Sequence, residues 1–126
     1  MIKLGKILVV DDQVGIRTLL VETFQDDQYD VEMAANGLEA LQLLTTFQPD
    51  LILLDFKMPG LNGIETLEKI RVLDRRVAVI MMTAYSGDLK KMEQETDDLE
   101  ILHYISKPFN LFDLREQVRK ILSSST

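Results

Sequence analysis

Five short apolar segments recur at similar intervals along the chain, and they restrict the fold more than any other feature of the sequence. They comprise residues 7–10, 31–34, 51–54, 77–82 and 101–105. Most of them are apolar without alternation, which is typical of strands that helices cover on both faces of a parallel sheet. A strand with one face in water would instead alternate apolar and polar residues. The pattern therefore predicts a buried, parallel sheet.

Segments with the period of an α-helix lie between and after these apolar segments. Their apolar stripes are Ile16, Leu19, Leu20 and Phe24; Leu38, Leu41 and Leu44; Ile64, Leu67 and Ile70; and Leu111, Leu114, Val118, Ile121 and Leu122. Residues 86–98 are more polar and carry only a thin stripe of Leu89, Met92 and Thr96. Strand and helix thus alternate five times, which predicts an α/β fold: a flavodoxin-like (βα)5 three-layer sandwich with strand order 2-1-3-4-5.

Length and composition fit one domain without disulfides. The 126 residues are 46% apolar and 28% charged, and no linker or low-complexity tract divides them. We therefore expect a single domain over residues 1–126, with a frayed tail at residues 123–126 and no effector domain. The chain has no cysteine and only one histidine, which excludes thiol catalysis and metal clusters built on Cys or His.

Charge and hydropathy exclude two classes of partner. The net charge of −7 argues against nucleic acid, because phosphate contacts need a basic surface. No apolar run approaches the roughly 20 residues of a membrane-spanning helix, and the N-terminus lacks the apolar part of a signal peptide. We therefore expect a cytoplasmic protein that binds neither nucleic acid nor membranes. The basic run Arg71, Arg75 and Arg76 is interpreted as a solvated helix end.

Three carboxylates follow two strands that the predicted order places side by side. Asp11 and Asp12 follow the first strand and Asp55 follows the third, and ligands of such sheets bind beyond the carboxyl ends of the strands at this switch point. Any one Asp could be a helix cap, but three at this edge favour a binding site. Two unit charges ~4 Å apart repel by about 4 kcal/mol at an effective dielectric near 20, so a proton or a cation must join them. A small set of oxygen ligands suits Mg²⁺ best, with Mn²⁺ as a substitute.

A hydroxyl and an ammonium group are expected at the same edge of the sheet. Thr83 ends the fourth strand and Lys107 follows the fifth. Alone, Thr83 would be interpreted as a helix cap and Lys107 as a solvated surface charge. Together with the acids and a metal ion they make a site for a phosphoryl group, in which a carboxylate is the nucleophile and the cations stabilise the phosphoryl oxygens.

The segments that carry these residues resemble the receiver domain of bacterial response regulators. The matching segments are residues 7–12 (ILVVDD), 49–60 (PDLILLDFKMPG), 62–63 (NG), 82–84 (MTA) and 107–109 (KPF), and the resemblance covers essentially the whole chain. More narrowly, residues 11–17 and 34–41 resemble the stand-alone receivers that relay a phosphoryl group in the Bacillus-type sporulation phosphorelay. The stretch from Thr83 to Lys107 departs from the family, because it is longer and has residues 97–100 in place of the usual Gly-Ala pair.

The resemblance implies a role for each acidic residue. Asp55 would be the phosphoryl acceptor. Asp12 and Asp55 would bind Mg²⁺ directly, the backbone carbonyl of Lys57 would be a third ligand, and Asp11 would act largely through water.

The resemblance also implies how the site responds to phosphorylation. Thr83 would donate a hydrogen bond to a phosphoryl oxygen, and Lys107, preceding Pro108 through a cis peptide bond, would pair with another. Tyr104 matches the switch aromatic, which moves inward when Thr83 swings toward the phosphate. His103, the only histidine, is interpreted as a packed or surface residue and not as a phosphate carrier.

The function implied is phosphoryl relay. A sensor histidine kinase would donate from its phosphohistidine to Asp55, a downstream histidine phosphotransferase would receive the group, and a regulatory phosphatase would be a further partner. Such a chain catalyses its own aspartyl phosphorylation, and no small-molecule turnover is expected. The alternative is a receiver of the motility-regulator type, which acts by phosphorylation-dependent binding to a partner protein.

The rim of the site is expected to bind partners. Its candidate residues are Gln13, Gly15, Ile16, Arg17, Pro59, Gly60, Ala84, Tyr85, Pro108 and Phe109. Ile16 could equally be a core residue, and Arg17 could equally be a solvated charge.

Three competing functions are weighed against the relay. A flavin or nucleotide protein of this fold would need a Gly- and Ser-rich loop after the first strand, where this chain has Asp11 and Asp12. An aspartyl phosphatase would place a second Asp two residues after the nucleophile, where Lys57 stands. A silent docking receiver would have lost Asp55 or Lys107, and both are present.

Overall fold

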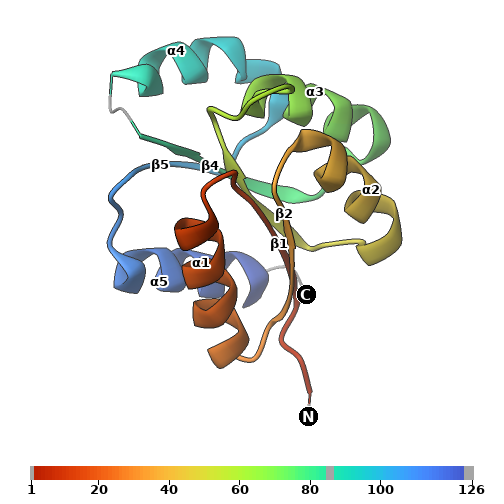
Figure 1. Ribbon diagram of the computed structural model, residues 1–126, viewed down its shortest axis with the longest axis vertical. Helices are drawn as coiled ribbons and strands as arrows, with labels where there is room; N and C mark the ends of the chain where they lie inside the picture. Colours follow the sequence, from red (N-terminus) through yellow and green to blue (C-terminus); the bar gives the residue numbers. More distant parts are fainter. Residues whose placement is uncertain (1, 85–86, 124–126) are drawn as a thin grey trace.

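The computed structural model describes residues 2–84 and 87–123 (Figure 1). Its centre is a five-stranded parallel sheet of order β2-β1-β3-β4-β5, as predicted. The strands are β1 (Lys6–Val10), β2 (Asp30–Ala34), β3 (Leu51–Asp55), β4 (Ala78–Thr83) and β5 (His103–Ser106). The helices are α1 (Val14–Asp26), α2 (Gly37–Phe47), α3 (Gly63–Leu73), α4 (Asp88–Glu95) and α5 (Leu111–Ser123), and a short 3-10 helix η1 (Asp97–Leu99) follows α4.

Helices cover both faces of the sheet, which gives the three-layer sandwich (Figure 1). Alternate residues of each strand enter opposite cores. In β1, Ile7 and Val9 pack with α1 and α5, whereas Leu8 and Val10 pack with α2 and α3. Because both faces are covered, all four of these residues are fully buried, and this explains why the central strands show no alternation in sequence.

The two strands at the edges of the sheet differ from the central ones. In β2, Met33 is 51% exposed, and β5 is only half-buried. The fifth strand also begins at His103, two residues later than its apolar segment predicts. The segment's second residue, Leu102, still donates its N–H to the carbonyl of Val79 at 3.0 Å, so it approaches β4 without joining the regular pairing.

Two leucines in the predicted helical stripes are not buried. Leu19 is 42% exposed and Leu38 is 66% exposed, so the prediction of a core position was wrong for both. In α1 the buried positions are Leu20 and Phe24, four residues apart. Leu19 is adjacent to this pair and is turned by about 100° around the helix. Leu38 lies in the first turn of α2, where the buried row begins at Gly37 and continues through the next turns.

Close packing fixes the loop between β3 and α3. Asn62 caps α3 and exchanges two hydrogen bonds with Glu65, in a capping box. Gly63 then lies directly against the end of β3, and a Cβ there would be 2.5 Å from the carbonyl oxygen of Asp55. The glycine therefore allows α3 to start immediately behind Asp55 and holds the end of that strand in place.

Candidate functional site

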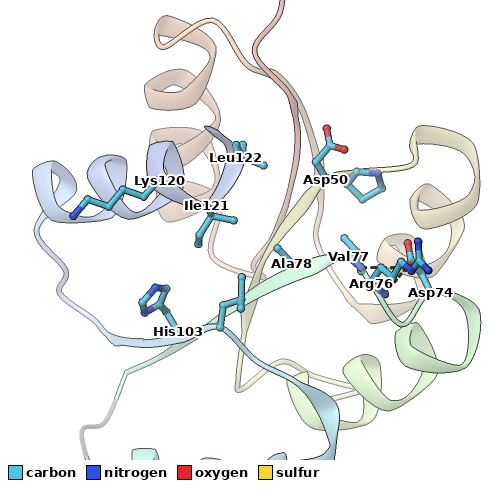
Figure 2. A pocket seen from close by; sticks show the side chains of 11 residues that line it. Asp50, Asp74, Arg76, Val77, Ala78, His103, Lys120, Ile121 and Leu122 are labelled. Carbon is cyan, nitrogen blue, oxygen red and sulfur yellow. Dashed lines mark hydrogen bonds between the residues drawn. The ribbon is translucent and has the colours of Figure 1, made fainter. Parts of the chain in front are cut away.

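In the part of the chain that the structure describes, carboxylates line both edges of the sheet, but a group of three lies at one edge only. At the amino edge, a cavity of about 610 Å³ lies between the starts of β4 and β5 and the end of α5 (Figure 2). Both of its carboxylates accept backbone hydrogen bonds: Asp74 Oδ1 accepts the N–H groups of Arg76 and Val77 in a turn, and Asp50 Oδ2 accepts the N–H of Lys6 at the start of β1. His103 lines this cavity, and so it lies away from the carboxyl edge.

The carboxyl edge brings Asp11, Asp12 and Asp55 together. One carboxylate oxygen of each lies within 4.8 Å of the others. Asp11 follows β1 and is fully buried, Asp55 ends β3 and is 4% exposed, and Asp12 is exposed. The cluster thus has two buried acids and one that faces solvent, and it lies at the switch point that the sequence predicts.

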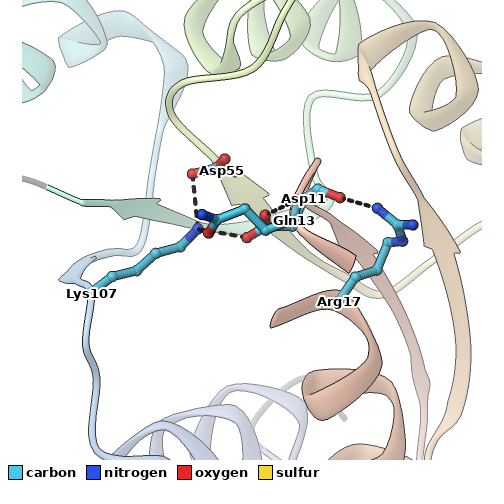
Figure 3. Close-up of polar contacts among 5 residues, drawn as sticks. All are labelled: Asp11, Gln13, Arg17, Asp55 and Lys107. Atoms are coloured by element: carbon cyan, nitrogen blue, oxygen red, sulfur yellow. Dashed lines mark hydrogen bonds and ion pairs between the residues drawn. The ribbon is translucent and has the colours of Figure 1, made fainter. Parts of the chain in front are cut away.

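Lys107 reaches into this cluster from the segment after β5 (Figure 3). Its Nζ lies 2.7 Å from Asp11 Oδ2, 3.3 Å from Asp55 Oδ1 and 3.3 Å from the side-chain oxygen of Gln13. The backbone N–H of Lys107 donates to the carbonyl of Thr83 at 2.6 Å. The Lys107–Pro108 peptide bond is cis, as the resemblance implied. One ammonium group therefore partly neutralises two carboxylates that the fold has crowded together.

Burial and the neighbouring charge change the acidity of Asp55. Desolvation is the largest cause and the negative charge of Asp11 is the next, and together they raise the pKa of Asp55 from 3.8 to about 7. Lys107 opposes the change but does not cancel it. Among the described residues three carboxylates meet here, and the ammonium group of Lys107 contacts two of them, so a cation that joined the cluster would be favoured.

Backbone and side-chain hydrogen bonds hold Asp11. Its Oδ1 accepts the N–H of Gln13 at 2.9 Å, and its carbonyl accepts from Nη1 of Arg17 at 2.6 Å. Arg17 is therefore half-buried and bound to the first strand's end (Figure 3). Neither of the two interpretations from sequence described this contact, which ties the start of α1 to the acidic cluster.

Thr83 ends β4, and Tyr104 is the second residue of β5. Thr83 is 1% exposed. Tyr104 is half-buried, and its hydroxyl lies 2.6 Å from Oγ1 of Thr96. The side chain of Tyr104 is thus held by the segment that follows α4.

The donor set fits a hard divalent cation. All three side chains offer carboxylate oxygens, the ligand type that Mg²⁺ takes in proteins, and Asp12 keeps one side of the cluster open to water. A bound metal ion would favour the ionised form of Asp55, which burial disfavours. Lys57, whose backbone carbonyl is the further expected ligand, is exposed and lies two residues after Asp55.

The predicted partner surface is partly exposed. The exposed candidates are Gln13, Gly15, Pro59, Gly60, Ala84 and Pro108, and the half-buried ones are Ile16, Arg17 and Phe109. Ile16 and Phe109 pack against the core beneath α1 and α5, which favours the core interpretation of Ile16. Tyr85 lies outside the described residues.

Arg71 was wrongly interpreted as part of a solvated helix end. It is 4% exposed, whereas Arg75 and Arg76 are exposed. A signal for this was present in the sequence, because Arg71 lies four residues after Leu67 and so shares the buried face of α3.

Comparison with known proteins identifies relatives over the whole fold. The model of the response regulator receiver domain matches residues 7–119. The chain is 50% identical over 117 residues to sporulation initiation phosphotransferase F of Bacillus subtilis (strain 168), a match that covers 93% of each protein.

Two solved structures extend the comparison. A CheY-like receiver domain protein of Methanospirillum hungatei JF-1 superimposes with a TM-score of 0.88 at 32% identity and covers 95% of this chain and 94% of that one. The response regulator protein TrrA of Thermotoga maritima, in complex with Mg²⁺ and BeF, gives a TM-score of 0.82 at 37% identity and covers 93% of this chain and 98% of that one. Among the helices of the described residues, none is long and apolar enough to cross a membrane.

Proposed function

We propose that Asp55 accepts a phosphoryl group from a phosphohistidine of a partner protein, because this chain belongs to the response regulator receiver domain family. The observation that carries this proposal is the cluster itself: two buried carboxylates and an exposed one share an edge of the sheet with a single ammonium group. Such a concentration of charge is costly in a fold that does not use it. This arrangement suits the transfer of a phosphoryl group, whose charged oxygen atoms enter and leave the site.

The transfer itself is a displacement at phosphorus. A carboxylate oxygen of Asp55 forms the new bond to phosphorus while the bond from phosphorus to the histidine nitrogen breaks, and that nitrogen keeps the electron pair. The ammonium of Lys107 pairs with one phosphoryl oxygen and the hydroxyl of Thr83 donates to another. These groups position the phosphoryl group and offset its charge, which is most of what such a transition state needs.

We further propose that the cation is Mg²⁺, with Mn²⁺ able to replace it. Asp11, Asp12 and Asp55 would hold it with the backbone carbonyl of Lys57, because these oxygen donors suit a hard cation. When bound, it would neutralise charge on the carboxylates and on the incoming phosphoryl oxygens. The solved receiver from Thermotoga maritima was crystallised with Mg²⁺ and BeF, which supports this choice.

The similarity to sporulation initiation phosphotransferase F supports a place in a sporulation phosphorelay. In this proposal a sensor histidine kinase supplies the phosphoryl group, a histidine phosphotransferase receives it, and a regulatory phosphatase removes it. The partners would dock on the rim, where Gln13, Gly15, Pro59, Gly60 and Ala84 are exposed beside the acidic cluster.

The test begins with a small phosphoryl donor. The chain is incubated with phosphoramidate and Mg²⁺, and intact mass is measured. We expect one added phosphoryl group in the wild type and in the control D26N, which changes an exposed aspartate of α1, and none in D55N. An adduct that persists in D55N would refute the assignment of Asp55.

The second stage separates relay from simple signalling. The phosphorylated chain is mixed with a histidine phosphotransferase, and the label on both proteins is followed. A relay predicts that the label leaves Asp55 and appears on the histidine. Stable binding with the label retained on Asp55 would instead favour the motility-regulator type of receiver.

A further inference from the structure

Arg71 is a buried cation outside the acidic site. It lies in the last turn of α3, and it makes no ion pair among the residues that the structure describes. Its guanidinium group instead donates to four backbone carbonyls: those of Leu99 at 2.8 Å, Val77 at 2.8 Å, Glu100 at 3.1 Å and Asp74 at 3.3 Å. Desolvation lowers its pKa, whereas the charges of Glu100 and Asp74 raise it, and the four carbonyls replace the water that burial removes from the guanidinium group.

The four carbonyls belong to two different connections. Asp74 and Val77 lie between α3 and β4, next to Arg71 in sequence. Leu99 and Glu100 lie 28 and 29 positions further on, in the segment that leads to β5. In this segment Glu100 takes a left-handed conformation with φ of 56°. Arg71 therefore fastens the segment to α3 and to the start of β4.

A second tie holds the same segment. Thr96 is buried after the end of α4, and its hydroxyl donates to the carbonyl of Met92. Because that proton is used, the hydroxyl of Tyr104 is the donor in its 2.6 Å contact with Thr96 Oγ1. Both ends of the connection before β5 are thus attached to buried groups.

The register of β5 depends on this connection. β5 is a four-residue edge strand that pairs only with β4, from His103 opposite Ile80 to Ser106 opposite Thr83. A slip of one residue would exchange its two faces and move Lys107 by about 3.3 Å. Lys107 Nζ lies 2.7 Å from Asp11 Oδ2 and 3.3 Å from Asp55 Oδ1, so a backbone shift of a whole residue, with the opposite face of β5 turned toward the cluster, would disturb both contacts.

We propose that Arg71 is a positioning residue, which sets the register of β5 through the carbonyls of Leu99 and Glu100 and so places Lys107 against Asp11 and Asp55. The proposal rests on the proposed function, since it concerns how Lys107 is delivered to the phosphoryl-accepting site. It assigns Arg71 no contact with the phosphoryl group.

The test compares R71M, which keeps an unbranched apolar stem and removes the donors, with R75M, which changes an exposed arginine four residues on. Amide hydrogen exchange is measured along the chain. In R71M we expect the amides of residues 102–106 to exchange at least about tenfold faster, while those of β1 and β3 stay within about twofold of wild type. We expect no change in R75M.

Function is measured on the same variants. At saturating Mg²⁺, R71M should take the phosphoryl group from phosphoramidate at least about tenfold more slowly, because Lys107 is misplaced. Its Mg²⁺ affinity should stay within about threefold, because β1 and β3 carry the carboxylates. If Arg71 only stabilised the fold, the phosphorylation rate and the Mg²⁺ affinity would fall together. R71K keeps the positive charge but loses the planar guanidinium group with its several donors, so its phosphorylation rate should lie between those of R71M and wild type. R71K replaces R71M in every measurement if R71M does not fold.

Two results would overturn the proposal. One is amide exchange in R71M that accelerates uniformly over all five strands. The other is an unchanged rate of phosphorylation in R71M, or in R71K where R71K replaces it. A wild-type chain that accepts no phosphoryl group refutes the proposed function instead. The exchange comparison would then still decide whether Arg71 sets the register of β5.

Discussion

Binding of Mg²⁺ is predicted to depend on pH near neutrality, because the cation must displace a proton from Asp55. Burial and the charge of Asp11 raise the pKa of Asp55 to about 7. An ordinary aspartate, at 3.8, would already be ionised throughout the physiological range and would give no such dependence.

The size of the effect follows from that pKa. At pH 8 about nine tenths of the metal-free molecules have an ionised Asp55, and at pH 6 about one tenth do. Since the ionised form binds the cation, the apparent affinity should fall by about tenfold between pH 8 and pH 6. Near pH 7 each binding event should release about half a proton.

The assay is isothermal titration calorimetry with Mg²⁺ at pH 6, 7 and 8. At pH 7 the titration is repeated in buffers that differ in ionisation enthalpy, so that the number of released protons is measured directly. D55N serves as the control, since it cannot release this proton and should lose the dependence between pH 6 and pH 8. D11N removes the second cause of the raised pKa, so its dependence should move to lower pH.

One result would refute the reasoning. If Mg²⁺ binds with equal affinity at pH 6 and pH 8 and releases no proton at pH 7, then Asp55 is already ionised in the metal-free protein, and the crowding of Asp11 and Asp55 does not have the electrostatic effect assigned to it.

Three further predictions concern stability and the groups around the acids. In metal-free buffer the raised pKa of Asp55 contributes at most roughly 4 kcal/mol to the stability of the fold below about pH 4, and this contribution should be lost as the pH rises toward 7. Urea unfolding at pH 4.5 and pH 7.5 measures the loss. The control is D55N, which should not show it. K107M should lower the rate of phosphorylation by phosphoramidate by about 10²-fold or more, whereas an unchanged rate would show that the ammonium group has no part in the transfer. G63A should destabilise the fold by about 1–3 kcal/mol, because the new Cβ would be 2.5 Å from the carbonyl oxygen of Asp55. The control G15A should not destabilise it, because nothing lies within 4 Å of a Cβ at that position. Equal midpoints for the two variants in thermal unfolding would contradict this account.

The sheet and the acidic cluster could be predicted from sequence because both follow from local patterns. Continuous apolar runs mark strands covered on two faces, and the order 2-1-3-4-5 then brings Asp11, Asp12 and Asp55 to one edge. No knowledge of side-chain packing is needed for that step, since the ends of parallel strands meet wherever the strands pair.

The errors came from features that depend on packing between distant segments. Periodicity shows that Leu19 and Leu38 lie near an apolar face, but it does not show where the core ends. The role of Arg71 depends on carbonyls 28 and 29 positions away, and these come within reach only because the fold brings the connection before β5 against the end of α3. The contact between Thr96 and Tyr104 arises from the same connection.

The contact between Lys107 and Asp11 has a consequence for biosynthesis. It joins residues 96 positions apart, so every residue up to Lys107 must leave the ribosome before the ammonium group can meet the carboxylates. Until then, a nascent chain has its acids without their cationic partner, and it should remain inert toward a donor protein. A nascent chain that does not yet include Lys107 should therefore not consume the signal.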